Sequence, residues 1–181
     1  MAATVVIKRL LGTAPGQSGS VDITSGNTRL KQADNGTADA NNPVPAVTTS
    51  YSYWASTQLQ VTVAPSNGIN NIKWYSDGSS FGTGLTCSGY SANATNAYTQ
   101  ATSAIVLNTS NYTSLAGAPV DVTTLTSGSP HTLAGSPSIG NTTGYLGGTT
   151  NGIFVFQLAA TSSASPGTIS ARTVTWQYDE T

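Results

Sequence analysis

The chain has 181 residues, with only six Lys or Arg and seven Asp or Glu, for a net charge of −1, whereas Ser and Thr together number 52. A typical soluble domain is about a quarter charged, so hydroxyls, amides and backbone must cover this surface. Such groups are cheaper than ions to desolvate beside a hydrogen-bonding partner. This composition favours a structural or adhesive protein that packs against neighbours, and the few scattered basic residues exclude a nucleic acid-binding face.

The N-terminal quarter of the chain holds one clear strand. Thr4 to Leu11 is apolar at strand length and is followed by turn residues at 12–16. Residues 12–50 contain few large apolar side chains and several breakers, including 41–45 (Asn-Asn-Pro-Val-Pro). We therefore predict an N-terminal strand and extended arm over residues 1–50. The arm would have one further strand near Thr28–Gln32 and become ordered only against a neighbouring subunit.

From residue 51 onward, short apolar stretches alternate with polar residues at the period of a strand. Leu59, Val61 and Val63 would share one buried face, as would Ile72 and Trp74, and Trp176 would be a core residue of the last strand. Residues 152–158 begin with Gly152 and are then apolar at every position except Gln157. A strand that is apolar on both faces is predicted to lie at the centre of a sheet. Further candidate strands are 85–87, 97–102, 104–107 and 120–125.

No window shows helical spacing with caps, and β-branched residues dominate. The sequence thus predicts an all-β fold, an antiparallel β-sandwich or jelly roll at 51–181 with an extended N-terminal arm. No apolar stretch reaches the length of a membrane span, and the basic pair Lys8-Arg9 follows the first apolar run instead of preceding it, unlike a signal peptide. We therefore expect synthesis and folding in a cytoplasm, with no membrane partner.

Residue types for catalysis and metal binding are scarce. The single His131 falls in a loop-like Ser-Gly-Ser-Pro-His stretch, with no nucleophile elbow around any Ser, and the single Cys87 cannot form an intramolecular disulfide. Asp34–Asp39 and Asp77-Gly78-Ser79 offer oxygen ligands for calcium, but Asx-Gly turns explain them equally well. We therefore expect no enzyme activity, no catalytic residues, no metal and no cofactor.

Aromatic residues cluster beside the first strand of the second region. Tyr51, Tyr53 and Trp54 follow one another closely among amides and hydroxyls. Exposed aromatic rings in such a setting suit stacking on sugars or anchoring at a protein interface. These three residues are the candidate interface or ligand contact.

Two segments resemble small all-β structural proteins of tailed bacteriophages. The first is Ile72–Gly78 (Ile-Lys-Trp-Tyr-Ser-Asp-Gly) with Phe81–Gly84 (Phe-Gly-Thr-Gly), and the second is Ala164–Thr181, which resembles the C-terminal hairpin of those proteins. The likeness covers roughly residues 45–181. It implies an accessory virion component, such as a head-decorating protein, without a defined catalytic site.

The sequence therefore leads to one main hypothesis and two alternatives. The main one is a capsid decoration (cement) protein located in the virion and made in the host cytoplasm. Its partners would be the major capsid protein and copies of itself, as a homo-oligomer on a symmetric assembly. The first alternative is an adhesin or receptor-binding module on a tail or fibre. The second is an extracellular filament subunit that exchanges its N-terminal strand with a neighbour.

Overall fold

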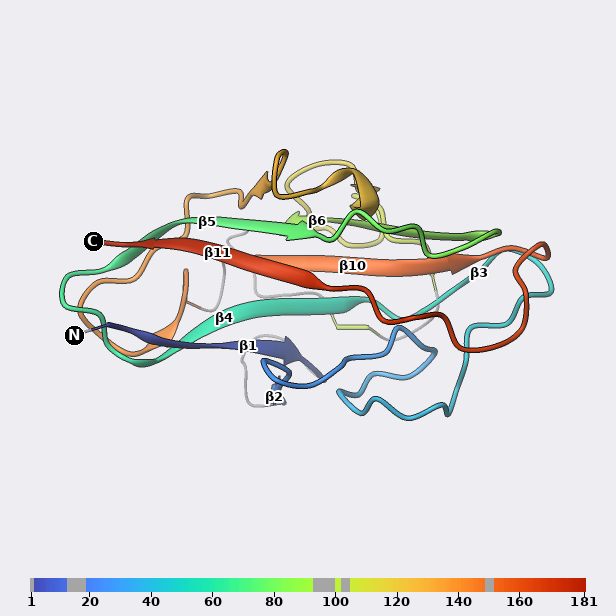
Figure 1. Cartoon of the computed structure of the whole chain (residues 1–181), viewed down its shortest axis with the longest axis horizontal. Helices are drawn as coiled ribbons and strands as arrows, with labels where there is room; N and C mark the ends of the chain where they lie inside the picture. The colour runs from blue at the N-terminus through green and yellow to red at the C-terminus, as the bar shows by residue number, and fades with distance from the viewer. Residues whose placement is uncertain (1, 13–18, 93–99, 102–104, 149–151) are drawn as a thin grey trace.

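The structure is a computed structural model that describes residues 2–12, 19–92, 100–101, 105–148 and 152–181 (Figure 1). These residues form two antiparallel sheets, which confirms the predicted all-β sandwich. The elements are β1 (Thr4–Leu10), β2 (Val21–Asp22), β3 (Ser50–Tyr51), β4 (Ala55–Val63), β5 (Ile69–Ser76), β6 (Leu85–Ala92), β7 (Val120–Asp121), the 3-10 turn η1 (Val122–Thr124), β8 (His131–Thr132), β9 (Gly144–Tyr145), β10 (Ile153–Ala160) and β11 (Val174–Glu180).

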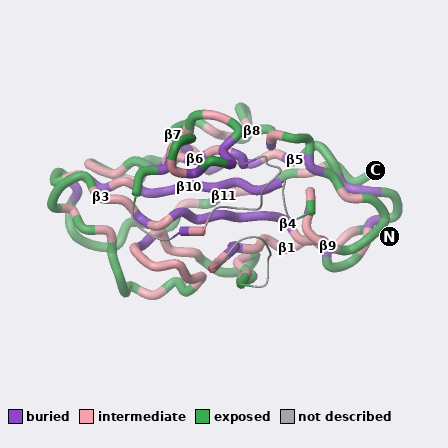
Figure 2. The backbone as a smooth tube through the Cα atoms, turned by 180° about the vertical axis from the view of Figure 1, so that it is seen from behind, coloured by how far each residue is buried: buried purple, intermediate pink, exposed green. Residues whose placement is uncertain are grey.

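The larger sheet, sheet A, has the strand order β2-β1-β4-β10-β6-β7, with β3 beside β10 and β9 beside β4. Its centre is β10, which pairs with β6 over its whole length and with β4 and then β3 on its other side. Nearly every residue of β10 is buried, as Figure 2 shows. The apolar run at 152–158 is therefore the central strand that the sequence predicts.

The smaller sheet, sheet B, has the order β11-β5-β8 and packs on one face of sheet A. Trp176 of β11 lies directly opposite Trp74 of β5. The Trp74 ring stacks on Phe154 of sheet A, with 4.0 Å between ring centroids and planes 10° apart. Both Trp side chains belong to the core between the sheets, which confirms their predicted place.

A second apolar core covers the opposite face of sheet A. Ile153 and Val155 of β10 point into it, and Leu107, Tyr112 and Leu115 of the long connection between β6 and β7 close it. Burial of sheet A on both faces explains why Gln58 of β4 is buried although it alternates with Leu59. At the far end of the same strand, Val63 is exposed, contrary to the predicted face.

The N-terminal region differs from the predicted extended arm. The predicted first strand is present as β1, and it pairs with β4 from one end to the other. The described part of the following segment, residues 19–50, folds back against its own domain, and 28–32 is not a strand. Leu30 and Val44 of this segment pack on the core between the sheets, so it finds its partners within the chain.

Other predicted strands have mixed outcomes. The candidate at 85–87 is the start of β6, and the one at 120–125 is β7 followed by η1. The candidates at 97–102 and 104–107 lie partly outside the described residues, and 100–101 and 105–107 are not in strands. The C-terminal hairpin that the resemblance implies at Ala164–Thr181 is absent, because β11 is the only strand in this segment and it pairs with β5.

Candidate functional site

The three candidate aromatic residues lie where β3 passes into β4, and they do not share one exposed face. Tyr51 and Tyr53 are partly exposed, but Trp54 is only 3% exposed. The Trp54 ring packs edge-on against Tyr112, with 5.3 Å between ring centroids. Trp54 is therefore a core residue and not a ligand contact, which corrects the expectation for this position. Two tyrosines remain available to a partner.

A local break in the sheet creates this arrangement. Ser52 lies between β3 and β4 beside Leu158 of β10, and its hydroxyl accepts a hydrogen bond from the Leu158 N–H at 3.0 Å. The side chain of Gln157 holds the same break, because its amide donates to the Ser52 carbonyl at 2.8 Å. Its side-chain oxygen accepts from the Leu107 N–H at 2.6 Å. Sequence patterns do not identify Gln157 as an anchor, since it occupies one position in an apolar strand.

The backbone of the tyrosine segment is also fixed by the 19–50 segment. The Lys31 carbonyl accepts from the Tyr53 N–H at 2.9 Å. The side-chain amide of Gln32 donates to the Tyr51 carbonyl at 3.1 Å. Any contact surface at Tyr51 and Tyr53 therefore rests on a part of the chain that the sequence places in a separate arm.

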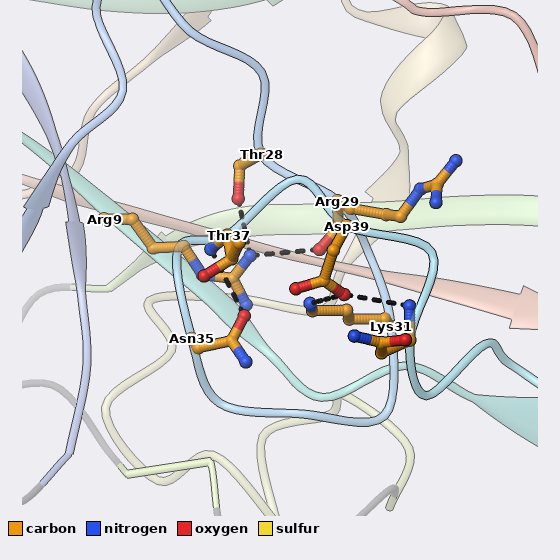
Figure 3. A network of polar contacts seen from close by, with 8 residues as sticks. Arg9, Thr28, Arg29, Lys31, Asn35, Thr37 and Asp39 are labelled. Atoms are coloured by element: carbon orange, nitrogen blue, oxygen red, sulfur yellow. Dashed lines mark hydrogen bonds and ion pairs between the residues drawn. The ribbon is translucent and has the colours of Figure 1, made fainter.

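Two buried cations hold the 19–50 segment in place (Figure 3). The guanidinium of Arg9 on β1 donates from Nη1 to the Thr28 hydroxyl at 2.6 Å and to the Arg29 carbonyl at 3.1 Å. Lys31 is 1% exposed and forms an ion pair with Asp39 at 2.8 Å. The same Asp39 oxygen accepts from the Asn41 N–H, which fixes the returning half of the loop.

Burial and hydrogen bonding shift the pKa values of the charged groups in this polar network. Burial lowers the pKa of Arg9 to about 10, and Asp34 opposes that change. The hydrogen bond from Lys31 lowers the pKa of Asp39. The Nε and Nη2 atoms of Arg9 are buried without a hydrogen-bond partner in the structure. Arg9 and Lys31 are thus buried structural anchors, whereas Asp39 keeps a partly exposed carboxylate.

His131 lies in β8 and not in a loop as the sequence suggests. Its Nε2 atom is 2.9 Å from the Ser91 hydroxyl, and desolvation lowers the pKa of the ring. Ser91 is fully buried, and its oxygen also accepts from the Ala134 N–H at 3.2 Å. A buried hydroxyl cannot reach a substrate, so this Ser–His pair links sheet A to β8 and lacks the access that nucleophilic catalysis needs.

The other residues that the sequence singles out have structural surroundings. The carboxylate of Asp77 accepts from the N–H groups of Ser79 and Thr173, both at 2.8 Å, and these bonds lower its pKa. The bond from Ser79 forms the Asx turn that the sequence offers as the alternative to a calcium site. The bond from Thr173 also joins this turn to the residue before β11. Burial raises the pKa of the Cys87 thiol, which makes it a poor nucleophile.

Comparison with models of protein families, with curated proteins and with solved structures gave no match for this chain. Within the described residues, no helix has the length and apolar character required to cross a membrane.

Proposed function

We propose that this chain is a virion structural protein, and more specifically a capsid decoration (cement) protein that stabilises the head of a tailed bacteriophage. The observation that carries the proposal is the position of the two segments that resemble phage structural proteins. Although far apart in sequence, they lie side by side, because β5 and β11 pair with Trp74 opposite Trp176. The two segments thus form one structural unit.

Polar contacts join the two segments beyond the strand pairing itself. The Arg172 guanidinium donates to the Ser80 carbonyl and lies over the Phe81 ring, 5.9 Å from its centroid. Asp77 binds the Thr173 N–H from the opposite segment. Two of the few charged side chains in the chain are therefore used to hold this unit together.

The composition of the surface suits a protein that remains packed on a lattice. The described residues contain two ion pairs, Lys8–Asp22 and Lys31–Asp39, and the remaining polar surface is mostly uncharged. Such a surface can be covered by the major capsid protein and by further copies of this chain without a large cost of ion desolvation. Binding would rest on shape, apolar contact and hydrogen bonds.

The direct test is binding of the purified protein to undecorated phage heads at low and high salt. Salt screens exposed charge pairs over about 8–10 Å but has little effect on neutral contacts. We expect nearly equal binding at both salt concentrations and greater heat resistance of the decorated heads. Absence of binding to heads under both conditions would refute the decoration hypothesis.

The adhesin alternative is tested in parallel with variants of the exposed tyrosines. Tyr51→Ser and Tyr53→Ser remove the partly exposed rings, whereas Trp54→Ser would disrupt the core and is unsuitable. Binding to host cells that is lost in both variants, without binding to heads, would favour an adhesin. The strand-exchanging filament subunit would require β1 to leave its pairing with β4.

A further inference from the structure

The last strand, β11, forms an open edge of sheet B. It pairs with β5 and with no other strand among the described residues. The corresponding edge of sheet A is better covered. There β2 pairs with part of β1, the Ile23 N–H donates to the Ile7 carbonyl, and the Ile7 N–H donates to the Thr24 hydroxyl.

The direction of the free backbone groups of β11 follows from the bonds of β5. The Ser76 N–H donates to Leu125, and the Ile72 carbonyl accepts from Leu133, so both groups point away from β11. In an antiparallel ladder, directly opposite residues either exchange two bonds or both point outward. Val174, which faces Ser76, therefore directs its N–H and C=O to the open edge.

The same alternation extends along the strand. Trp176 faces Trp74, whose backbone groups point away from β11 as those of Ser76 do. The N–H and C=O of Trp176 therefore also point to the open edge. Beyond the register shift at 177–179, Glu180 faces Ile69, and Ile69 exchanges both of its bonds with Ile139. Tyr178 lies between Trp176 and Glu180, two residues whose backbone groups point to the open edge. The edge thus presents a row of unpaired donors and acceptors at alternate residues.

This edge has little of the protection that natural edge strands carry. Lysines, prolines, bulges and inward charges usually block pairing with another chain. The register shift places its extra residue in β5 and not in β11, and the acidic residues Asp179 and Glu180 are confined to the C-terminal end of β11. The stretch Val174–Gln177 carries neither charge nor proline.

The neighbouring strands limit what can occupy this edge. On the open side of β11, sheet A continues through β4, β1 and β2, and no strand of sheet B lies in front of them in Figure 1. If a second copy of the chain paired through its own β11, its sheet A would have to occupy the same layer as sheet A of the first copy. A single extended strand would instead lie over the inner side of β1, where Val5 and Ile7 are half-buried.

We propose that β11 accepts one extended strand donated by another protein chain, which would extend sheet B by β-augmentation. The donor has apolar side chains at alternate positions, directed toward Val5 and Ile7. In antiparallel orientation it carries a basic residue near its N-terminus, opposite Asp179 and Glu180, whose carboxylates also accept hydrogen bonds from the Asn71 side chain and the Ala3 N–H. This inference does not require that the donor be a capsid protein.

Residue-resolved amide hydrogen exchange of the full chain by NMR provides the test, with a synthetic nine-residue peptide of alternating Thr and Val and an N-terminal Lys as the probe. In the free protein, the Trp176 and Tyr178 amides should exchange faster than the Thr175 and Gln177 amides, which bond to β5. Saturating peptide should slow exchange of the first pair by about tenfold or more, equivalent to about 1.4 kcal/mol. A peptide of the same sequence, N-methylated at alternate residues, should have no effect.

A matched pair of variants separates the backbone from the side chain. Tyr178→Pro removes an outward N–H, whereas Tyr178→Val loses the ring but keeps that donor. Only Tyr178→Pro should abolish the peptide effect, and the N-methylated peptide provides the same contrast on the unaltered protein. Absence of protection by the alternating peptide, or equal loss in both variants, would overturn the proposal. Dimerisation of the free protein with protected β11 amides, seen by sedimentation, would assign the edge to a second copy and also overturn it.

Discussion

Trp74 is the residue whose replacement tests the packing of the two sheets most directly. Its side chain is 0% exposed, stacks on Phe154 and lies 5.9 Å from the Phe156 ring centroid. Removal of a large aromatic side chain from such a site typically costs about 3–5 kcal/mol, out of a total stability of about 5–15 kcal/mol. We therefore expect Trp74→Ala to remove a large fraction of the free energy of unfolding.

The indole nitrogen allows a sharper comparison. Nε1 of Trp74 is buried without a hydrogen-bond partner, which costs about 1–3 kcal/mol. Trp74→Phe removes this orphaned donor and keeps a ring against Phe154, so its net cost should stay below about 1.5 kcal/mol.

Urea titrations followed by far-UV circular dichroism would measure both changes. Val63→Ala, at a position 40% exposed, serves as the control and should cost less than about 1 kcal/mol. A loss below about 1 kcal/mol for Trp74→Ala, or equal losses for Ala and Phe, would refute the packing described for this core.

Three further predictions follow from the N-terminal region and from His131. Deleting residues 1–45 removes β1 and the polar network, so we expect loss of the cooperative thermal transition, and a truncated protein that still melts cooperatively would contradict this. Arg9→Met should lower the free energy of unfolding by about 1–3 kcal/mol, because it leaves the Thr28 hydroxyl and the Arg29 carbonyl without their buried donor; an unchanged or increased free energy of unfolding in urea would show that the guanidinium does not anchor the segment. Because desolvation lowers the pKa of His131 in the folded state, the unfolded chain binds the proton more readily. Stability should therefore be constant above pH 6.5–7 and fall as the pH decreases from about 6.5 toward the lower folded pKa, and His131→Phe should flatten denaturation curves measured between pH 7 and pH 5.

Much of the sandwich is predictable because its strands follow simple periodic patterns. The apolar run of β10 indicates a central strand, and the spacing of Ile72 and Trp74 indicates an inward face. These features depend on side chains near one another in sequence. The pairing of β11 with β5 instead depends on contacts between distant segments, which no local pattern encodes.

The position of the 19–50 segment could not be predicted for a different reason. Its anchors, Arg9 and Lys31, are charged residues that usually lie in water, so a hydropathy pattern assigns them to the surface. Their burial is possible only because Thr28, the Arg29 carbonyl and Asp39 are brought to them by the fold. The burial of Trp54 is similarly set by Tyr112, a residue distant from it in the sequence.

The pairing of β5 with β11 also determines when the protein can fold during synthesis. Asp77 and Thr173, which join these two strands at one end, are 96 residues apart in the chain. Contacts of such long sequence separation form slowly, because the entropy of closing the loop is lost before the contacts are gained. Until the ribosome has made and released β11, Trp74 and Phe154 lack the last strand that covers them. The emerging chain therefore exposes apolar surface until β11 is made, and we expect it to depend on chaperones at that stage more than a helical protein of the same length.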